Sequence, residues 1–306
     1  MSRFHKIINT VLTLAIFLTL ILAGCRSGGK DAVKGADSVI IQGANPEVYE
    51  ELKHAEKIFY TLPSPLESAM LIKSAGALFD NNLLNPIENT KKYSTNRSLA
   101  LNLGIYTCDL SFASLYDQTQ LIIDYMNAAK KMADGLGILD AIEQQDIDKL
   151  EENIHNTDVI MDIVSQTYMN SNSYLEDNNQ PAIAALVLTG GWLEGLYIST
   201  QLVDIKDING NKLVGRIIDQ KLSVEILLDL LENSKGHPAI DELIAQVVKV
   251  KAVFDKITIK TSPVRSEFDQ NANVTVLKSE IQADLTPEVF KELSVIVAEI
   301  RSNLIK

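Results

Sequence analysis

Apolar residues recur along most of this chain at the spacing of an amphipathic α-helix. Two clear stripes are Val224, Leu227, Leu228, Leu231 and Leu243, Val247, Val250, Phe254. Residues three, four and seven positions apart lie on one face of a helix, so each stripe predicts a helix with one buried side. The whole pattern predicts about ten helices, at residues 46–61, 65–80, 95–115, 117–135, 140–153, 156–176, 181–203, 213–233, 238–256 and 287–305.

The positions of the prolines support these helix starts. Six of the eight stand where a helix is predicted to begin, namely Pro46, Pro65, Pro86, Pro181, Pro238 and Pro287. Proline suits the first helical position because its missing N–H would have no partner there. Four of the six follow a residue that can cap a helix, namely Asn45, Ser64, Asn85 and Thr286. Ser64 with Glu67, and Asn85 with Glu88, have the spacing of a capping box.

Residues 257–285 do not fit the helical pattern. Residues 257–261 alternate like a strand, and residues 274–277 are able to pair with them, which predicts a loop or a small hairpin rather than a sheet. The predicted fold is therefore all-α, a single antiparallel bundle of about ten helices. Short matches between residues 104–143 and 190–241 leave open an internal duplication, since matches this short also arise by chance.

Charge and composition restrict the class of partner. The chain has 306 residues, is 46% hydrophobic and carries a net charge of −12, so it is neither disordered nor a disulfide scaffold. An acidic surface does not favour nucleic acid or anionic lipid headgroups, both of which demand a basic footprint. We expect no nucleic-acid partner.

The first 25 residues have the layout of a secretory signal. Arg3 and Lys6 precede an uncharged, mostly apolar run over residues 11–22, which is shorter than the roughly 20 residues that a membrane-spanning helix needs. The run ends in Leu22-Ala23-Gly24-Cys25. Here the chain resembles a bacterial lipoprotein precursor with a type II signal peptide, whose lipobox reads Leu, two small residues, then Cys.

The resemblance implies cleavage before Cys25, diacylglycerol on its sulfur and acylation of its new amine, hence attachment to a membrane. Arg26 stands where many inner-membrane lipoproteins of Gram-negative bacteria have Asp, which implies the outer membrane; the face remains open. In this lipoprotein interpretation, residues 1–24 form the signal peptide, 25–44 the lipidated cysteine with a flexible tether, and 45–306 the helical domain. An uncleaved membrane anchor is the alternative.

The most unusual segment of the predicted domain is 184–197, which places Gly190, Gly191 and Gly195 inside a helix. Each glycine there destabilises the helix by about 1 kcal/mol relative to Ala, unless it admits another backbone or a ligand. Glu194 has apolar neighbours, so it is expected to be buried and either paired or protonated.

Two interpretations of this segment follow. In the structural one, helices cross tightly and the acid bonds a hydroxyl, Asn102 or Arg97. In the functional one, aromatic and acidic side chains line a ligand pocket, namely Trp192, Glu194, Tyr197, Tyr106 and Asp109. Glu194 and Asp109 would then serve either plain binding or, as paired carboxylates, hydrolysis of a glycan.

Other candidate chemistry is weak. The four histidines are scattered, and no Cys/His cluster, phosphate loop or nucleophile elbow is present, so no metal or cofactor is predicted. Cys108 lies in an apolar segment and is expected to be a buried, inert thiol. The acid-rich stretch 143–152 is interpreted as a solvated helix face.

The mature chain lacks the Gly-x-His-x-x-Glu motif of imelysin-type helical lipoproteins but resembles other all-helical lipoproteins of Gram-negative envelopes. The sequence favours a non-catalytic role, in which the protein binds a small ligand or an envelope protein. Glycan hydrolysis is the alternative.

Overall fold

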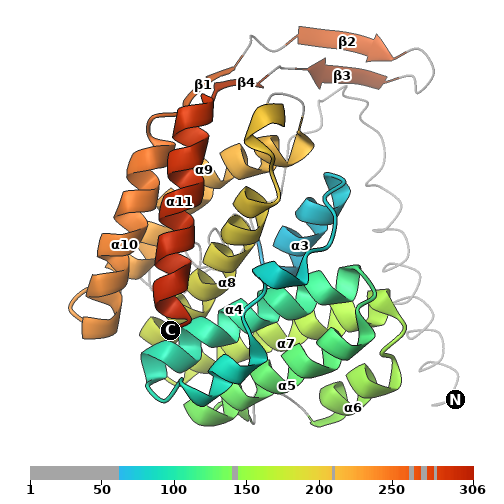
Figure 1. Cartoon of the computed structure of the whole chain (residues 1–306), viewed down its shortest axis with the longest axis vertical. Coiled ribbons are helices and arrows are strands. Elements are labelled where there is room, and N and C mark those ends of the chain that lie inside the picture. The colour runs from blue at the N-terminus through green and yellow to red at the C-terminus, as the bar shows by residue number, and fades with distance from the viewer. Residues whose placement is uncertain (1–61, 140–143, 209–210, 262–264, 270–273, 279–280) are drawn as a thin grey trace, which may run out of the picture. The chain divides into compact units, whose positions relative to one another are not determined.

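The computed structural model describes residues 62–139, 144–208, 211–261, 265–269, 274–278 and 281–306. The predicted signal peptide, Cys25, the tether and the predicted helix 46–61 with Asn45 and Pro46 lie outside these residues. Labels follow Figure 1. The helices are α3 (Pro65–Ser74), α4 (Asn96–Leu115), α5 (Thr119–Leu136), α6 (Gln144–Glu152), α7 (Thr157–Asp177), α8 (Pro181–Gln201), α9 (Lys212–Glu232), α10 (Pro238–Phe254) and α11 (Pro287–Leu304). Short 3₁₀ turns are η1 (Asn81–Leu83), η2 (Ile87–Lys91) and η4 (Ile205–Asp207).

These helices form an all-α bundle, as the sequence predicts. The most extensive packing joins α4 to α8 and α4 to α5. Helices α3 and α7 contact both α4 and α8, whereas α9 and α11 pack on α8, and α10 packs on α9 and α11. Figure 1 shows α10 and α11 side by side. Helices α4 and α8 therefore form the centre of the bundle.

The composition of α8 follows from this central place. It is the one described helix long and apolar enough to cross a membrane by length and composition, but 78% of its most apolar window is buried inside the protein. It has apolar residues all round because other helices cover it on every side.

Helix starts agree with the proline and capping signals at most sites. Ser64 and Glu67 form the predicted capping box, with Glu67 N–H donating to Ser64 Oγ (3.2 Å) and Ser64 N–H to Glu67 Oε2 (2.7 Å). Thr286 caps α11 as predicted. The prediction that Asn85 caps a helix is wrong. The 3₁₀ turn η2 begins after Pro86 and has no side-chain cap, and Asn85 is fully buried in the protein interior.

The predicted helix 65–80 is too long, because α3 ends at Ser74. Gly76 adopts a left-handed conformation with φ +86°, and its N–H donates to Lys73 O. A residue in this conformation terminates a helix and redirects the chain. The apolar positions after Ser74 belong to the connection toward η1.

Residues 257–285 contain a hairpin, as expected, but its pairing differs from the prediction. Strand β1 (Thr258–Thr261) pairs antiparallel with β4 (Ile281–Asp284), and β2 (Arg265–Asp269) pairs antiparallel with β3 (Val274–Lys278). Residues 274–277 thus pair with β2 and not with 257–261. Closing the shorter loop loses less chain entropy, so neighbouring segments pair first.

Candidate functional site

Of the three glycines of α8 predicted to admit a close neighbour, Gly190 lies where α8 crosses α4, opposite Gly104 of α4, which was not part of that prediction. Gly191 and Gly195 approach α3 instead, since an added Cβ would lie 2.9 Å from Pro65 Cγ and 2.7 Å from Ser68 Cβ. A Cβ added at Gly104 would lie 2.1 Å from Val187 O, and one at Gly190 would lie 2.0 Å from Leu101 O. Both distances are far inside van der Waals contact with backbone atoms, which cannot move aside as a side chain can. The predicted tight crossing is confirmed, and only glycine fits at these two positions.

Glu194 points from α8 to the C-terminal helix. Its carboxylate accepts two hydrogen bonds from Arg301, at 3.0 Å from Nε and 2.7 Å from Nη2. The Glu194 side chain is 0% exposed and that of Arg301 8%. Burial alone lowers the pKa of Arg301, but the charge and hydrogen bonds of Glu194 outweigh that effect and raise it. This is a bidentate buried ion pair.

The partners predicted for Glu194, a hydroxyl, Asn102 or Arg97, are wrong. Arg97 Nε donates to Ala239 O at 3.2 Å and its Nη2 lies 3.5 Å from Glu242. Arg97 stands at the start of α4, about 18 Å along the helix axis from Asp109 at 1.5 Å per residue. It is therefore too far from the acids to pair with either.

Asp109 lies against this ion pair and is fully buried. Its Oδ2 accepts from the Asn85 backbone N–H at 3.0 Å, and its Oδ1 receives no hydrogen bond from an ordinary donor among the described residues. Burial raises the pKa of Asp109 well above its usual value, and the charge of Glu194 and a hydrogen bond with it raise it further. Both effects favour the protonated form of Asp109, because a second buried negative charge beside Glu194 is unfavourable.

Asn85 joins this cluster to the rest of the core. Its Nδ2 donates to Tyr93 Oη (3.1 Å) and to Asn102 Oδ1 (3.0 Å). Asn102 Nδ2 in turn donates to Leu304 O at 3.1 Å, near the end of α11. The network therefore fastens the connection before α4 and the C-terminal helix to the acids of α4 and α8. We call Asp109, Glu194, Arg301 and Asn85 the polar cluster.

The aromatic residues proposed for a ligand pocket divide between different places. The Tyr197 ring lies 4.6 Å from Arg301 Cζ, so it packs on the polar cluster. Tyr106 Oη donates to Pro86 O at 3.1 Å, and burial, with the charge of Asp109, raises its pKa. Trp192 Nε1 donates to Gln220 on α9 at 2.9 Å. The Tyr106 hydroxyl and the Trp192 indole N–H are thus bonded to protein rather than aimed at a ligand.

The paired carboxylates are together but enclosed. Asp109 and Glu194 are each 0% exposed, so a glycan has no route to them in this structure. Cys108 is also fully buried, as expected, and burial raises the pKa of its thiol well above the usual value. A thiol that is enclosed and protonated is a poor nucleophile.

The sequence interpretation missed Arg301, although α11 contains a signal. Arg301 follows Val297 by four residues and precedes Leu304 by three, so it shares the buried face of the helix with them. A charged residue inside an apolar stripe implies a buried partner. That partner cannot be identified from spacing, because Glu194 lies 107 positions away.

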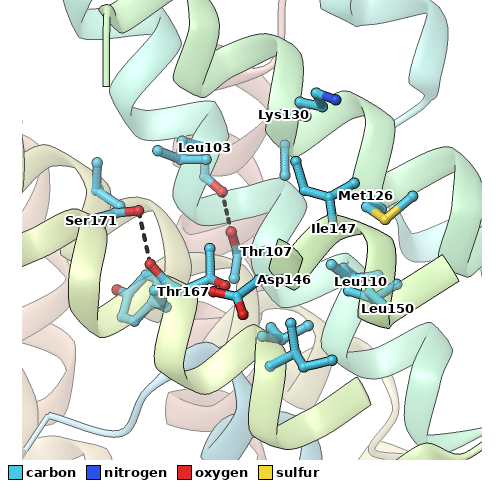
Figure 2. Close-up of a pocket in the computed structure, with 15 residues that line it drawn as sticks. Leu103, Thr107, Leu110, Met126, Lys130, Asp146, Ile147, Leu150, Thr167 and Ser171 are labelled. Carbon is cyan, nitrogen blue, oxygen red and sulfur yellow. Dashed lines mark hydrogen bonds between the residues drawn. The ribbon is translucent and has the colours of Figure 1, made fainter. Parts of the chain in front are cut away.

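A second interior feature lies on the neighbouring face of α4 (Figure 2). A cavity of about 70 Å³ opens between α4, α5, α6 and α7, and Val187 of α8 completes its wall. Its lining is almost entirely apolar and includes Leu103, Leu110, Met126, Ala129, Ile147, Leu150 and Val164. We call it the α4–α7 pocket.

The hydroxyls that line the α4–α7 pocket are satisfied within their own helices. Thr107 Oγ1 donates to Leu103 O at 2.7 Å, and Ser171 Oγ donates to Thr167 O at 2.8 Å. The charged side chains that line it are Lys130 and Asp146. The sequence pattern places Asp146 only on a solvated helix face, because apolar spacing does not reveal an unfilled space.

No group of three or more His, Cys, Asp or Glu side chains able to hold a metal ion occurs within the described part of the chain. Searches against protein-family models, curated proteins and solved structures find no match to this chain.

Proposed function

We propose that the chain is a non-catalytic binding protein, attached by lipid at Cys25 to the outer membrane, that takes the apolar part of a small ligand in the α4–α7 pocket. The observation that carries the binding proposal is a space bordered by five helices with an almost wholly apolar lining. Apolar cavities hold apolar ligands, because water gains few hydrogen bonds there.

The enclosure of Asp109 and Glu194 supports a non-catalytic role. Both are bonded to protein groups, and neither is exposed. A general acid and base must contact the substrate within hydrogen-bond reach, which a sealed cluster prevents. The cluster has a structural task instead, since it joins α4, α8 and α11.

Xenon occupancy tests the binding proposal without assuming the ligand's polarity. The full-length protein, labelled with ¹³C at its methionine methyl groups, is placed in lipid nanodiscs and equilibrated with xenon. Met126 lines the pocket and its signal should shift, whereas exposed Met70 is the internal reference. Loss of the Met126 signal in Met126→Leu gives the assignment.

Ala129→Phe should abolish the xenon shift by filling the pocket from α5. The matched control is Ala298→Phe on α11, at a similarly half-buried alanine that does not line the pocket. An unchanged Met126 signal in the native protein under xenon would refute the binding proposal.

Membrane attachment is tested separately. Cys25→Ser should release the protein from membranes and remove the acyl mass from its amino terminus. Cys108→Ala is the control for losing a cysteine and should leave attachment intact. Persistent membrane association of Cys25→Ser, or an intact unmodified amino terminus on the native protein, would refute the lipid anchor.

A further inference from the structure

We infer that the ligand of the α4–α7 pocket is a short primary alkylammonium ion, whose carbon chain enters the pocket and whose ammonium group binds Asp146. This inference rests on the proposed binding function and adds to it the chemical class of ligand. It depends on the placement of Asp146, on the charges around the pocket and on the size of the cavity.

Asp146 is the acidic side chain of the pocket. It extends from α6 into the space between α4 and α7, toward Thr107 and Thr167 in Figure 2. Its side chain is 18% exposed, and its one ion pair within the described residues is to Lys149 at 3.6 Å, a side chain 57% exposed. A pair at that distance with a solvated lysine is weak, so a ligand ammonium can take its place.

The charges around the pocket favour a cation over an anion. Among the described residues, Lys130 is the one basic side chain in the lining, and Figure 2 shows it on the opposite side of the pocket from Asp146. Helix α6 carries further acids at Asp148 and Glu152, and the chain as a whole has a net charge of −12. The local and the long-range fields therefore both attract cations.

The cavity size limits the ligand's length. The cavity of about 70 Å³ is well above the roughly 10–15 Å³ that one buried water needs, so it has room for a small ligand. A pentyl chain with its ammonium nitrogen is a ligand of this class. A sugar ring brings as many atoms but needs a hydrogen-bond partner for each hydroxyl, and the pocket hydroxyls are already bonded to backbone carbonyls.

The test compares three ligands that differ only in the head group. Pentylammonium, pentanol and pentanoate are titrated into the nanodisc sample, with the Met126 methyl signal as readout and empty nanodiscs as blank. We expect pentylammonium to bind at least about tenfold more tightly than pentanol, and pentanoate to bind most weakly.

Asp146→Asn should weaken pentylammonium binding by about tenfold and leave pentanol binding unchanged, which also shows that the variant is folded. Glu152→Gln removes the same charge from an exposed position of α6 and should change neither.

The outcomes separate the two proposals. Equal binding of pentylammonium and pentanol, both blocked by Ala129→Phe, would overturn the alkylammonium inference and keep the apolar binding function. Tightest binding of pentanoate would also overturn it, and would assign head-group recognition to Lys130. If the pocket takes neither xenon nor any of the three ligands, both proposals fail.

Discussion

Two faces of α4 border parts of the protein interior that differ in character: one is polar and closely packed, and the other is apolar and partly unfilled. Asn102, Tyr106 and Asp109, spaced four and three residues apart, face the polar cluster, where the acids have hydrogen-bond partners. Leu103, Thr107 and Leu110 repeat the same spacing one position later and face the α4–α7 pocket. A shift of one residue, about 100° around the helix, separates a sealed charged centre from an apolar space.

The difference shows where binding is available in this fold. Buried charge is stable only with fixed partners, and the Glu194 carboxylate of the polar cluster already uses both oxygens on Arg301. The α4–α7 pocket differs from the polar cluster, because its apolar walls need no hydrogen-bond partner and its volume is unfilled. Variants on the two faces should therefore behave differently, and four predictions test this, from the largest expected effect to the smallest.

Arg301→Met should have the largest effect. It leaves Glu194 buried without its cation, and removing one partner of a buried ion pair lowers the free energy of unfolding by about 3–5 kcal/mol. Urea denaturation measures the change. Arg216→Met is the matched control, because its pair with Asp219 is more than half exposed on both sides, and should change stability by less than about 1 kcal/mol. If Arg301→Met lowered the free energy of unfolding as little as Arg216→Met, the polar cluster would not hold the core together.

Gly190→Ala should destabilise the α4–α8 crossing by about 2–3 kcal/mol, because the new methyl group clashes with the backbone at Leu101. Gly215→Ala in α9 meets nothing within 4 Å and should instead stabilise the protein by about 0.5–1 kcal/mol through helix propensity. Thermal unfolding followed by circular dichroism compares them. Equal effects would show that the crossing relaxes to admit a methyl group.

Asp109→Asn should change the pH dependence of stability. Burial raises the pKa of Asp109 in the folded protein above the unfolded value of about 3.9, so the folded state binds more protons between these values. The contribution of Asp109 to the free energy of unfolding is complete below its pKa in the unfolded chain. It falls by up to about 1.4 kcal/mol per pH unit as the pH rises toward its pKa in the folded protein. Asn keeps the donor without titrating, so urea denaturation from pH 4 to 8 should show a flatter profile. An unchanged slope would contradict a neutral Asp109.

A matched pair of hydroxyl deletions should give the smallest effects. Tyr93→Phe removes bonds to Asn85 and Ile305 O in the polar cluster and should lower stability by about 1–2 kcal/mol. Thr107→Val removes a bond to a carbonyl of its own helix at the pocket and should change stability by less than about 0.5 kcal/mol. Chemical denaturation compares both with the native protein. A larger loss for Thr107→Val would mean that the two faces do not differ as described.

The sequence predicted the helices well because their signals are local. The apolar stripe of α10 and the capping residues Ser64 and Thr286 act within one or two turns. Predictions failed where a distant residue decided the outcome. Asn85 has the sequence context of a cap, but its backbone N–H bonds Asp109 and its side chain bonds Asn102.

The glycines of α8 were an accurate signal of close approach, and the burial of Glu194 followed from its apolar neighbours. The same reasoning from neighbouring residues could not identify the partner of Glu194. Arg97 and Arg301 are both arginines near helix ends, and only the packing of α11 on α8 places Arg301 at the acid. The α4–α7 pocket was missed altogether, because its lining residues have the same apolar pattern as a filled core.

By itself the sequence determined the helices, the close approach at Gly190 and the burial of Glu194, since periodicity, glycine and apolar context act through neighbouring residues. Tertiary structure alone decided that Arg301 pairs with Glu194, that burial beside Glu194 raises the pKa of Asp109, and that a space remains between α4 and α7. The physical reason is that pairing of buried charge and unfilled volume depend on side chains from helices far apart in sequence, whose relative positions no local pattern specifies.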